Sequence, residues 1–345
     1  MEKTRVVIMG AGLGGLGAGV KLKEAGIDDF LIFERNPKVG GTWYENKYPG
    51  CCCDTPVALY QFSFFKSTKW NYLYPRSAEI QIYAEEMVEV YQLESHLRLA
   101  EVAIQATWDA NTCLWHVKTN SGREITANAI IAALGQLNRP AFPDIEGRDR
   151  FEGPSMHSAR WNETVALKDK RVGVIGSAAS AIQLIPEVAK DASALTVFQR
   201  SANYVIPKID RKITAEEKAL MSTVPEIAKN LGQHQRKMMY DHSEYFYWQT
   251  FSWTEEGRAS FSRVALNHLA ENVSDPELLK KLTPDYPIGC KRILVANDFY
   301  PAMMRDNVSL VTDGIARITQ KGVETSEGTH HPCDVLVFAT GFETT

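Results

Sequence analysis

The sequence predicts an α/β protein of two lobes with a helical insert, and three observations support this prediction. A buried strand, a glycine-rich turn, a helix and a second strand follow one another between residues 4 and 35. The same order of elements returns between residues 170 and 200. The segment 211–286 contains stretches with a helical pattern. A chain of 345 residues commonly divides into two domains, which agrees with the repeated unit.

The first unit reads TRVVIMGAGLGGLGAGVKLKEAGIDDFLIFER and has the spacing of a Rossmann-like dinucleotide-binding turn. Gly10 allows the tight turn, and Gly12 lets the backbone approach a pyrophosphate at the start of the helix. Gly15 lets the helix pack closely on the strand. Glu34 follows Gly10 by 24 residues and can accept hydrogen bonds from ribose hydroxyls. An acid at this position suits a bare ribose, so we expect this unit to bind FAD.

The second unit, KRVGVIGSAASAIQLIPEVAKDASALTVFQR, repeats the spacing of the first. Arg200 follows Gly176 by 24 residues, and a basic residue there suits a 2'-phosphate, so we expect NADPH at this unit. Ala178 adds a methyl group where the backbone should meet phosphate, and an ordinary strand-helix-strand unit without a ligand remains the alternative. The turn residues assigned to cofactor binding are Gly176, Ser177 and Ser180, and Ala178 and Ala181 fill the other two glycine positions.

Composition excludes several other classes of protein. The net charge of -4 offers no broad basic surface for nucleic acid. The six cysteines follow no metal-ligand spacing, so we expect no metal site. The chain enters a strand directly, without a signal peptide, and no apolar run approaches the roughly 20 residues that span a bilayer. We therefore expect a cytoplasmic protein with reduced thiols and no stable membrane insertion.

Two apolar strands that stop at small residues, within EITANAIIAALGQLNRP and HPCDVLVFATGF, are expected to carry the chain between the lobes. They set the predicted domain limits. The first lobe comprises residues 1–140, with 336–345 returning to it. The second lobe comprises 141–209 and 287–335, and the helical insert comprises 211–286.

Residues 151–161, FEGPSMHSARW, place Phe151, Gly153, His157 and Trp161 in the pattern F-x-G-x-x-x-H-x-x-x-W. This resembles the fingerprint of Baeyer-Villiger monooxygenases, although Asn162 stands where the family usually has Pro or Asp. The resemblance implies an FAD- and NADPH-dependent monooxygenase that inserts one oxygen atom from O2 next to a ketone carbonyl through a flavin C4a-peroxide, giving an ester or lactone. It implies that His157 positions the linker between the lobes and is not a general base.

The segment YPIGCKRILVAND also resembles this family, in which a Lys-Arg pair follows a glycine-containing turn. The resemblance implies that Lys291 binds the 2'-phosphate together with Arg200, and that Arg292 faces the flavin as a catalytic residue. Together with YPGCCCDTP, this segment is most similar to the branch of the 4-hydroxyacetophenone monooxygenases.

The three consecutive cysteines in YPGCCCD raise the possibility of a redox or metal centre. FAD-dependent disulfide reductases place a cysteine directly after their G-G-T stretch, whereas here Gly41 and Thr42 are followed by Trp43, and all three are assigned to cofactor binding. Neighbouring cysteines pair only with strain, and three consecutive residues cannot wrap one tetrahedral ion. In the family an acid closes this loop, which implies that Asp54 contributes to catalysis and to cofactor binding and pairs with Arg292. A plain helix cap is the alternative for Asp54.

Two further activities stay open, a flavin-containing N- or S-oxygenase and an inactive truncated flavoprotein. Members of the family continue well beyond a segment similar to FATGFETT, so the resemblance implies that a C-terminal part is absent. For the chain as given we expect weak FAD retention, exposed hydrophobic surface and poor coupling of NADPH use to product.

Overall fold

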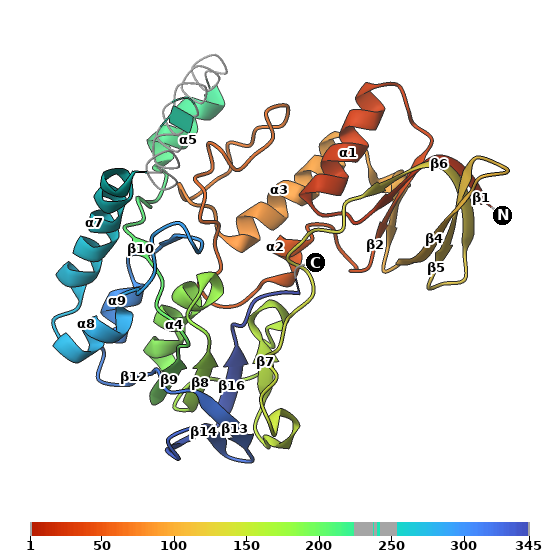
Figure 1. The fold of residues 1–345 in the computed structure, drawn as a ribbon. Coiled ribbons are helices and arrows are strands. Elements are labelled where there is room, and N and C mark those ends of the chain that lie inside the picture. The colour runs from red at the N-terminus through yellow and green to blue at the C-terminus, as the bar shows by residue number, and fades with distance from the viewer. Residues whose placement is uncertain (1, 224–236, 238–239, 242–253, 344–345) are drawn as a thin grey trace.

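The computed structural model describes residues 2–223, 237, 240–241 and 254–343. Two lobes lie side by side, each built on its own mainly parallel sheet (Figure 1). The α/β class predicted from the repeated unit is confirmed.

The first lobe contains a six-stranded sheet in the order β3-β2-β1-β6-β5-β4. Strand β1 pairs in parallel with β2 and β6, while β4, β5 and β6 form an antiparallel meander. The elements are β1 Glu2–Met9, α1 Leu13–Glu24, β2 Phe30–Glu34, α2 Thr42–Glu45, α3 Ser77–Val90, the 3-10 turn Glu94–His96, β3 Leu97–Leu99, β4 Ala103–Asp109, β5 Leu114–Thr119 and β6 Glu124–Ala132.

Strand β1 is buried on both faces, as the apolar run in its sequence predicts. Val6 and Ile8 pack against helices α1 and α3, which cover one face of the sheet (Figure 1). Val7 points to the other face and packs with Val117 and Ile125 of the meander. The helices and the meander thus enclose the strand that leads into the glycine turn.

The second lobe contains a five-stranded parallel sheet in the order β12-β9-β8-β16-β7. Helices α4 and α9 pack on one face, and a three-stranded sheet, β13-β14-β15, covers the other. The elements are the 3-10 turn Arg148–Arg150, β7 Ser155–His157, the 3-10 turn Ser158–Arg160, β8 Arg171–Ile175, α4 Ala179–Asp191, β9 Ala194–Phe198, β10 Val205–Ile206, β11 Leu294–Val295, α9 Phe299–Met303, β12 Val308–Val311, β13 Ile315–Thr319, β14 Gly322–Thr325, β15 His330–Pro332 and β16 Val335–Phe338.

The predicted return of residues 336–345 to the first lobe is wrong at its start. Strand β16 lies in the middle of the second sheet, hydrogen-bonded to β7 and β8. A buried apolar strand fits either lobe, and only its pairing decides between them. The chain leaves the second sheet after Phe338 and reaches the first linker at Phe342, which bridges Pro140.

The two linkers run antiparallel to each other. The amide of Ala141 donates to the carbonyl oxygen of Gly341 at 2.9 Å, and the amide of Glu343 donates to the carbonyl oxygen of Arg139 at 2.8 Å. The Thr340 hydroxyl donates to the carbonyl oxygen of Ala141 at 2.6 Å. Residues 139–141 and 340–343 therefore form a short backbone ladder between the lobes.

The described part of the insert contains the helices α5 Ala215–Thr223, α7 Glu255–Asn272 and α8 Pro276–Leu282. Asp275 caps α8 by accepting from the amides of Glu277 and Leu278. Helix α7 runs along the outer side of the second lobe (Figure 1). The aromatic run at 243–253 lies outside the described residues. Within the described part of the chain, no helix is both long and apolar enough to cross a membrane.

Candidate functional site

The first glycine turn joins β1 to α1 and leaves the start of the helix open. A Cβ atom at Gly15 would lie 1.8 Å from the carbonyl oxygen of Gly10, so this close contact requires glycine. Gly12 caps α1 without a side-chain hydrogen bond. A Cβ atom at Gly12 would meet only the Cα of Gly41, at 3.6 Å. The first amides of α1 are thus free of a capping side chain, which suits an anion.

Glu34 ends β2 as a buried carboxylate that contacts the turn. Its Oε2 accepts from the amide of Ala11 at 2.8 Å, and its Oε1 accepts from the amide and side chain of Asn36, each at 2.9 Å. A carboxylate has about four acceptor positions, so further hydroxyl donors can still bind. Glu34 therefore stands beside the helix start, as the ribose role requires.

Residues 40–43 face the first turn. Gly40 and Gly41 adopt positive φ angles of 117° and 55°, and α2 starts at Thr42. Trp43 Nε1 donates to the hydroxyl of Tyr60 at 2.9 Å. The Trp43 ring packs against apolar residues of both lobes, which places it at the boundary between them.

The second turn has the same construction at the start of α4. Gly176 has φ 110°, and a Cβ atom there would lie 2.5 Å from the carbonyl oxygen of Ala339. Ala178 caps α4 without a side-chain bond, and its backbone is extended, so the methyl group causes no backbone strain. Ser177 is buried. Ser180 lies in the first turn of α4, on the helix whose Gln183 accepts from the Tyr48 hydroxyl of the first lobe at 2.9 Å.

Two basic residues stand near this turn. Arg200 is exposed just after β9 and makes no hydrogen bond or ion pair with any residue in the described ranges. Lys291 Nζ donates to the hydroxyl of Ser201 at 2.7 Å and lies 4.3 Å from the ring centroid of Tyr286. The structure thus brings Lys291 to the residue next to Arg200, although the two are far apart in sequence.

Asp54 and Arg292 form an ion pair between the lobes. Arg292 donates to Asp54 Oδ2 through Nε at 3.1 Å and Nη2 at 2.5 Å. Both bonds use one oxygen, so Oδ1 stays available. The Arg292 side chain is 66% exposed and that of Asp54 27%. No helix starts directly after Asp54, because the next one, α3, begins at Ser77. The alternative that Asp54 caps a helix is therefore wrong.

The neighbouring cysteines are buried thiols. Burial raises the pKa of Cys51 and of Cys53 to about 12, which disfavours thiolate chemistry. Cys52 is also buried, and its Sγ accepts from Lys208 Nζ at 3.1 Å. All six cysteines are free, and the described residues contain no group of three or more His, Cys, Asp or Glu side chains that could hold a metal ion.

The fingerprint residues lie at the edge of the second sheet. A Cβ atom at Gly153 would lie 2.4 Å from the carbonyl oxygen of Asp334, so only glycine fits there. His157 ends β7, is 1% exposed, and accepts from the amide of Ala159 through Nδ1 at 3.1 Å. Burial lowers the pKa of His157 to about 4, so the ring is neutral. Phe151 packs under the three-stranded sheet, and Trp161 packs on the core between α4 and the second sheet.

His157 also touches both linkers. Its ring meets the edges of Phe142 and Phe342 at centroid distances of 5.4 and 5.8 Å. These contacts place His157 under the backbone ladder, which is where a residue that positions the linkers should lie.

The contact that Arg160 makes between the lobes was not predicted from the sequence. Arg160 donates through Nη1 to Glu45 at 3.0 Å and through Nη2 to the carbonyl oxygen of Asn138 at 3.0 Å. Glu45 also accepts from Arg35 and is nearly buried. Arg160 occupies a variable position of the fingerprint, so the pattern gave no signal for it.

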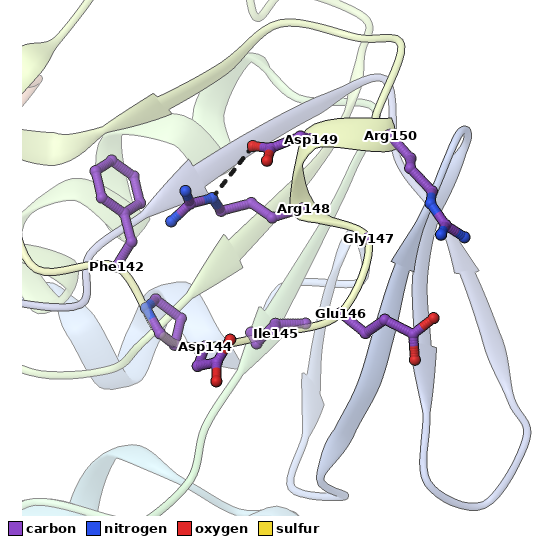
Figure 2. A pocket seen from close by; sticks show the side chains of 9 residues that line it. Phe142, Asp144, Ile145, Glu146, Gly147, Arg148, Asp149 and Arg150 are labelled. Atoms are coloured by element: carbon purple, nitrogen blue, oxygen red, sulfur yellow. Dashed lines mark ion pairs between the residues drawn. The ribbon is translucent and has the colours of Figure 1, made fainter.

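The loop 142–150 lines a pocket of about 510 Å³ (Figure 2). The Arg148 guanidinium lies 4.8 Å from the ring centroid of Phe142 and 3.6 Å from Asp149. The lining mixes both signs of charge and includes none of the predicted site residues. The pocket is formed by the linker, and neither Asp54 nor Arg292 lines it.

Comparison with known proteins places these features in a family. Residues 7–243 match the family model described as pyridine nucleotide-disulphide oxidoreductase. A protein of Pseudomonas aeruginosa named Baeyer-Villiger monooxygenase is 38% identical over 338 residues, which are 98% of this chain and 63% of that protein. The chain therefore spans less than two thirds of this relative.

Solved structures agree with this placement. A closed crystal structure of cyclohexanone monooxygenase superposes with a TM-score of 0.87 and 30% identity, covering 100% of this chain and 71% of the other. A structure of OTEMO in complex with FAD and NADP gives a TM-score of 0.86 and 28% identity, covering 99% of this chain and 72% of the other.

Proposed function

Because this chain belongs to the Baeyer-Villiger monooxygenase family, we propose that it uses FAD, NADPH and O2 to insert one oxygen atom next to a ketone carbonyl. The product is an ester or a lactone. The observation that carries the proposal is the ion pair of Asp54 and Arg292, because it sets an exposed cation at the junction of the two lobes.

The first lobe fits FAD. The start of α1 is open, Gly12 leaves room for a phosphate, and Glu34 supplies a buried carboxylate beside the turn. We propose that Gly41, Thr42 and Trp43 complete this site on the side that faces the second lobe.

The second lobe fits NADPH. The start of α4 is open at Ala178, and Arg200 and Lys291 supply two positive charges near it. Two cations suit a 2'-phosphate that carries about two negative charges, so NADPH should be preferred over NADH.

When bound, NADPH would supply two electrons, and FAD would accept them and pass them to O2. The chain's own contribution is electrostatic. Asp54 fixes the Arg292 guanidinium through a single carboxylate oxygen, and Nη1 makes no hydrogen bond with the described residues. An exposed guanidinium held in this way can stabilise an oxyanion that forms only during turnover, without reorganising.

We also propose that the chain belongs near the 4-hydroxyacetophenone monooxygenases within the family. The segments YPGCCCDTP and YPIGCKR support this, and both lie at the ion pair of Asp54 and Arg292. An aryl ketone should then be oxidised faster than cyclohexanone in a matched product assay, and the reverse order would contradict the placement.

The first experiment measures the FAD content of the purified chain and the anaerobic bleaching of bound flavin by NADPH and by NADH. Bound flavin that NADPH bleaches faster than NADH supports both nucleotide sites. Ketones are then tested in oxygen for ester formation. Sulfide or amine oxidation without any ester would point to an N- or S-oxygenase, and failure to bind FAD would point to an inactive flavoprotein.

Replacing Arg292 by Ala tests the catalytic role. We expect flavin reduction by NADPH to persist within about threefold while ester formation falls at least roughly 100-fold, as for removal of one oxyanion donor. Arg305→Ala, an exposed arginine of the same lobe, is the matched control and should leave both steps unchanged. Unchanged ester yield in Arg292→Ala would contradict the role.

A further inference from the structure

The loop 48–54 is bound to helix α4 by one side chain. Gln183 Oε1 accepts from the hydroxyl of Tyr48 at 2.9 Å and from the amide of Cys52 at 3.2 Å. Gln183 Nε2 donates to the carbonyl oxygen of Cys52 at 3.1 Å. A single glutamine of the second lobe thus holds backbone and side chain of a loop that belongs to the first.

The backbone of the loop adds a second constraint. Gly50 has φ 80°, and a Cβ atom there would lie 2.3 Å from the carbonyl oxygen of Gln183. Only glycine allows the loop and α4 to approach this closely. The hydrogen bonds of Gln183 therefore hold together a tightly packed joint.

The joint lies between the two parts of the candidate site. Gln183 is four residues beyond the first residue of α4, or about 6 Å along the helix axis. Asp54 follows Cys52 by two residues and binds Arg292. Lys208 Nζ donates to the Cys52 thiol at 3.1 Å. A shift of α4 relative to the loop therefore acts on Cys52, two residues before Asp54.

We propose that Gln183 is a positioning residue that couples α4, and hence the nicotinamide nucleotide, to Asp54 and the flavin site. This proposal rests on the proposed function only for the identity of the two bound nucleotides, NADPH at α4 and FAD in the first lobe. This role explains why the loop 48–54 is packed so tightly. The Cys52 backbone contacts Gln183, and the Cys52 thiol accepts from Lys208.

Amide hydrogen exchange tests the coupling without cofactors. In Gln183→Leu we expect the amides of residues 51–54 to exchange roughly tenfold faster, since all three hydrogen bonds that Gln183 makes to the loop, including the one from the Cys52 amide, are lost. Gln183→Glu keeps an acceptor for the Tyr48 hydroxyl and the Cys52 amide but loses the donor to the Cys52 carbonyl oxygen, so it should show a smaller increase. The β2 amides, and all amides in the surface variant Lys190→Leu, should exchange as in the unchanged protein. The proposal would be overturned if the amides of residues 51–54 exchanged at the same rate in Gln183→Leu as in the unchanged protein.

Flavin reduction separates positioning from general damage. In Gln183→Leu, we expect the rate of bleaching at saturating NADPH to fall roughly tenfold, because a small misplacement costs rate steeply. The half-saturating NADPH concentration should change by less than about twofold, since Gln183 does not contact the open amides of α4. A raised half-saturation with an unchanged rate would overturn the role. If the unchanged protein is not bleached at all, the proposed function fails, while the exchange result still decides the coupling.

Discussion

At the scale of single residues, the site depends on polar groups whose partners lie in the other lobe. Arg292 reaches Asp54 across 238 positions of sequence, and Arg160 reaches Glu45 across 115. His157 is buried beneath the linkers, and this burial lowers its pKa so that the ring is neutral. Because Nδ1 accepts from the amide of Ala159, Nε2 carries the proton of the neutral ring.

The burial of His157 predicts a dependence of stability on pH. Its pKa is about 4 in the folded chain and about 6.5 when unfolded, so the folded chain binds fewer protons between these values. The contribution of His157 is complete above pH 6.5 and is lost as the pH falls toward 4. Urea unfolding should show up to about 3 kcal/mol lost over this range.

His157→Asn supplies the comparison, because its side-chain oxygen can accept from Ala159 but does not titrate. The free energy of unfolding of this variant should fall less steeply with acid. Identical slopes for both proteins would show that His157 is accessible to protons in the folded chain.

At the scale of elements, the two open helix starts can be tested one at a time. At Gly12 φ is -69°, and a Cβ atom would meet only the Cα of Gly41. Gly12→Ala should therefore fold with an unfolding temperature within about 2 °C, yet bind FAD at least roughly tenfold more weakly, because the methyl group stands where backbone meets pyrophosphate. Titration with FAD measures the affinity.

Gly14→Ala is the matched control, since a Cβ atom there meets nothing within 4 Å and the residue is exposed. It should bind FAD as the unchanged protein does. Equal affinity of Gly12→Ala would place the pyrophosphate elsewhere.

At the scale of the whole molecule, contacts between lobes should contribute measurable stability. Arg160→Leu removes the bonds to the buried end of Glu45 and to Asn138, and we expect the free energy of unfolding to fall by about 1–2 kcal/mol. Proteolysis within residues 133–143 should become faster. Lys118→Leu, which removes an exposed pair within the first sheet, should change the stability by no more than about 0.5 kcal/mol. Equal losses of unfolding free energy in the two variants would mean that the Arg160 contact does not stabilise the arrangement of the lobes.

Sequence spacing predicted the parts that are local. Both glycine turns, their helices and the flanking strands follow from patterns within about 30 residues, because the turn, helix start and strand end are consecutive. The position of β16 in the second sheet could not be predicted, because the sequence of an apolar strand does not indicate which strand it pairs with. Gln183, Lys208 and Arg160 were missed for a related reason. Their partners are more than a hundred residues away, and each stands at a position that also reads as ordinary surface or helix.

The ladder between the linkers sets how the lobes can move. One flexible strand between two bodies allows bending and twisting about every axis, whereas two strands bonded side by side resist twisting and lengthening together. Residues 139–141 and 340–343 form such a pair. The ladder by itself leaves open one motion, a swing of one lobe relative to the other across its long axis. Such a swing would have to separate Asp54 from Arg292 and the loop 48–54 from Gln183, so these contacts oppose it.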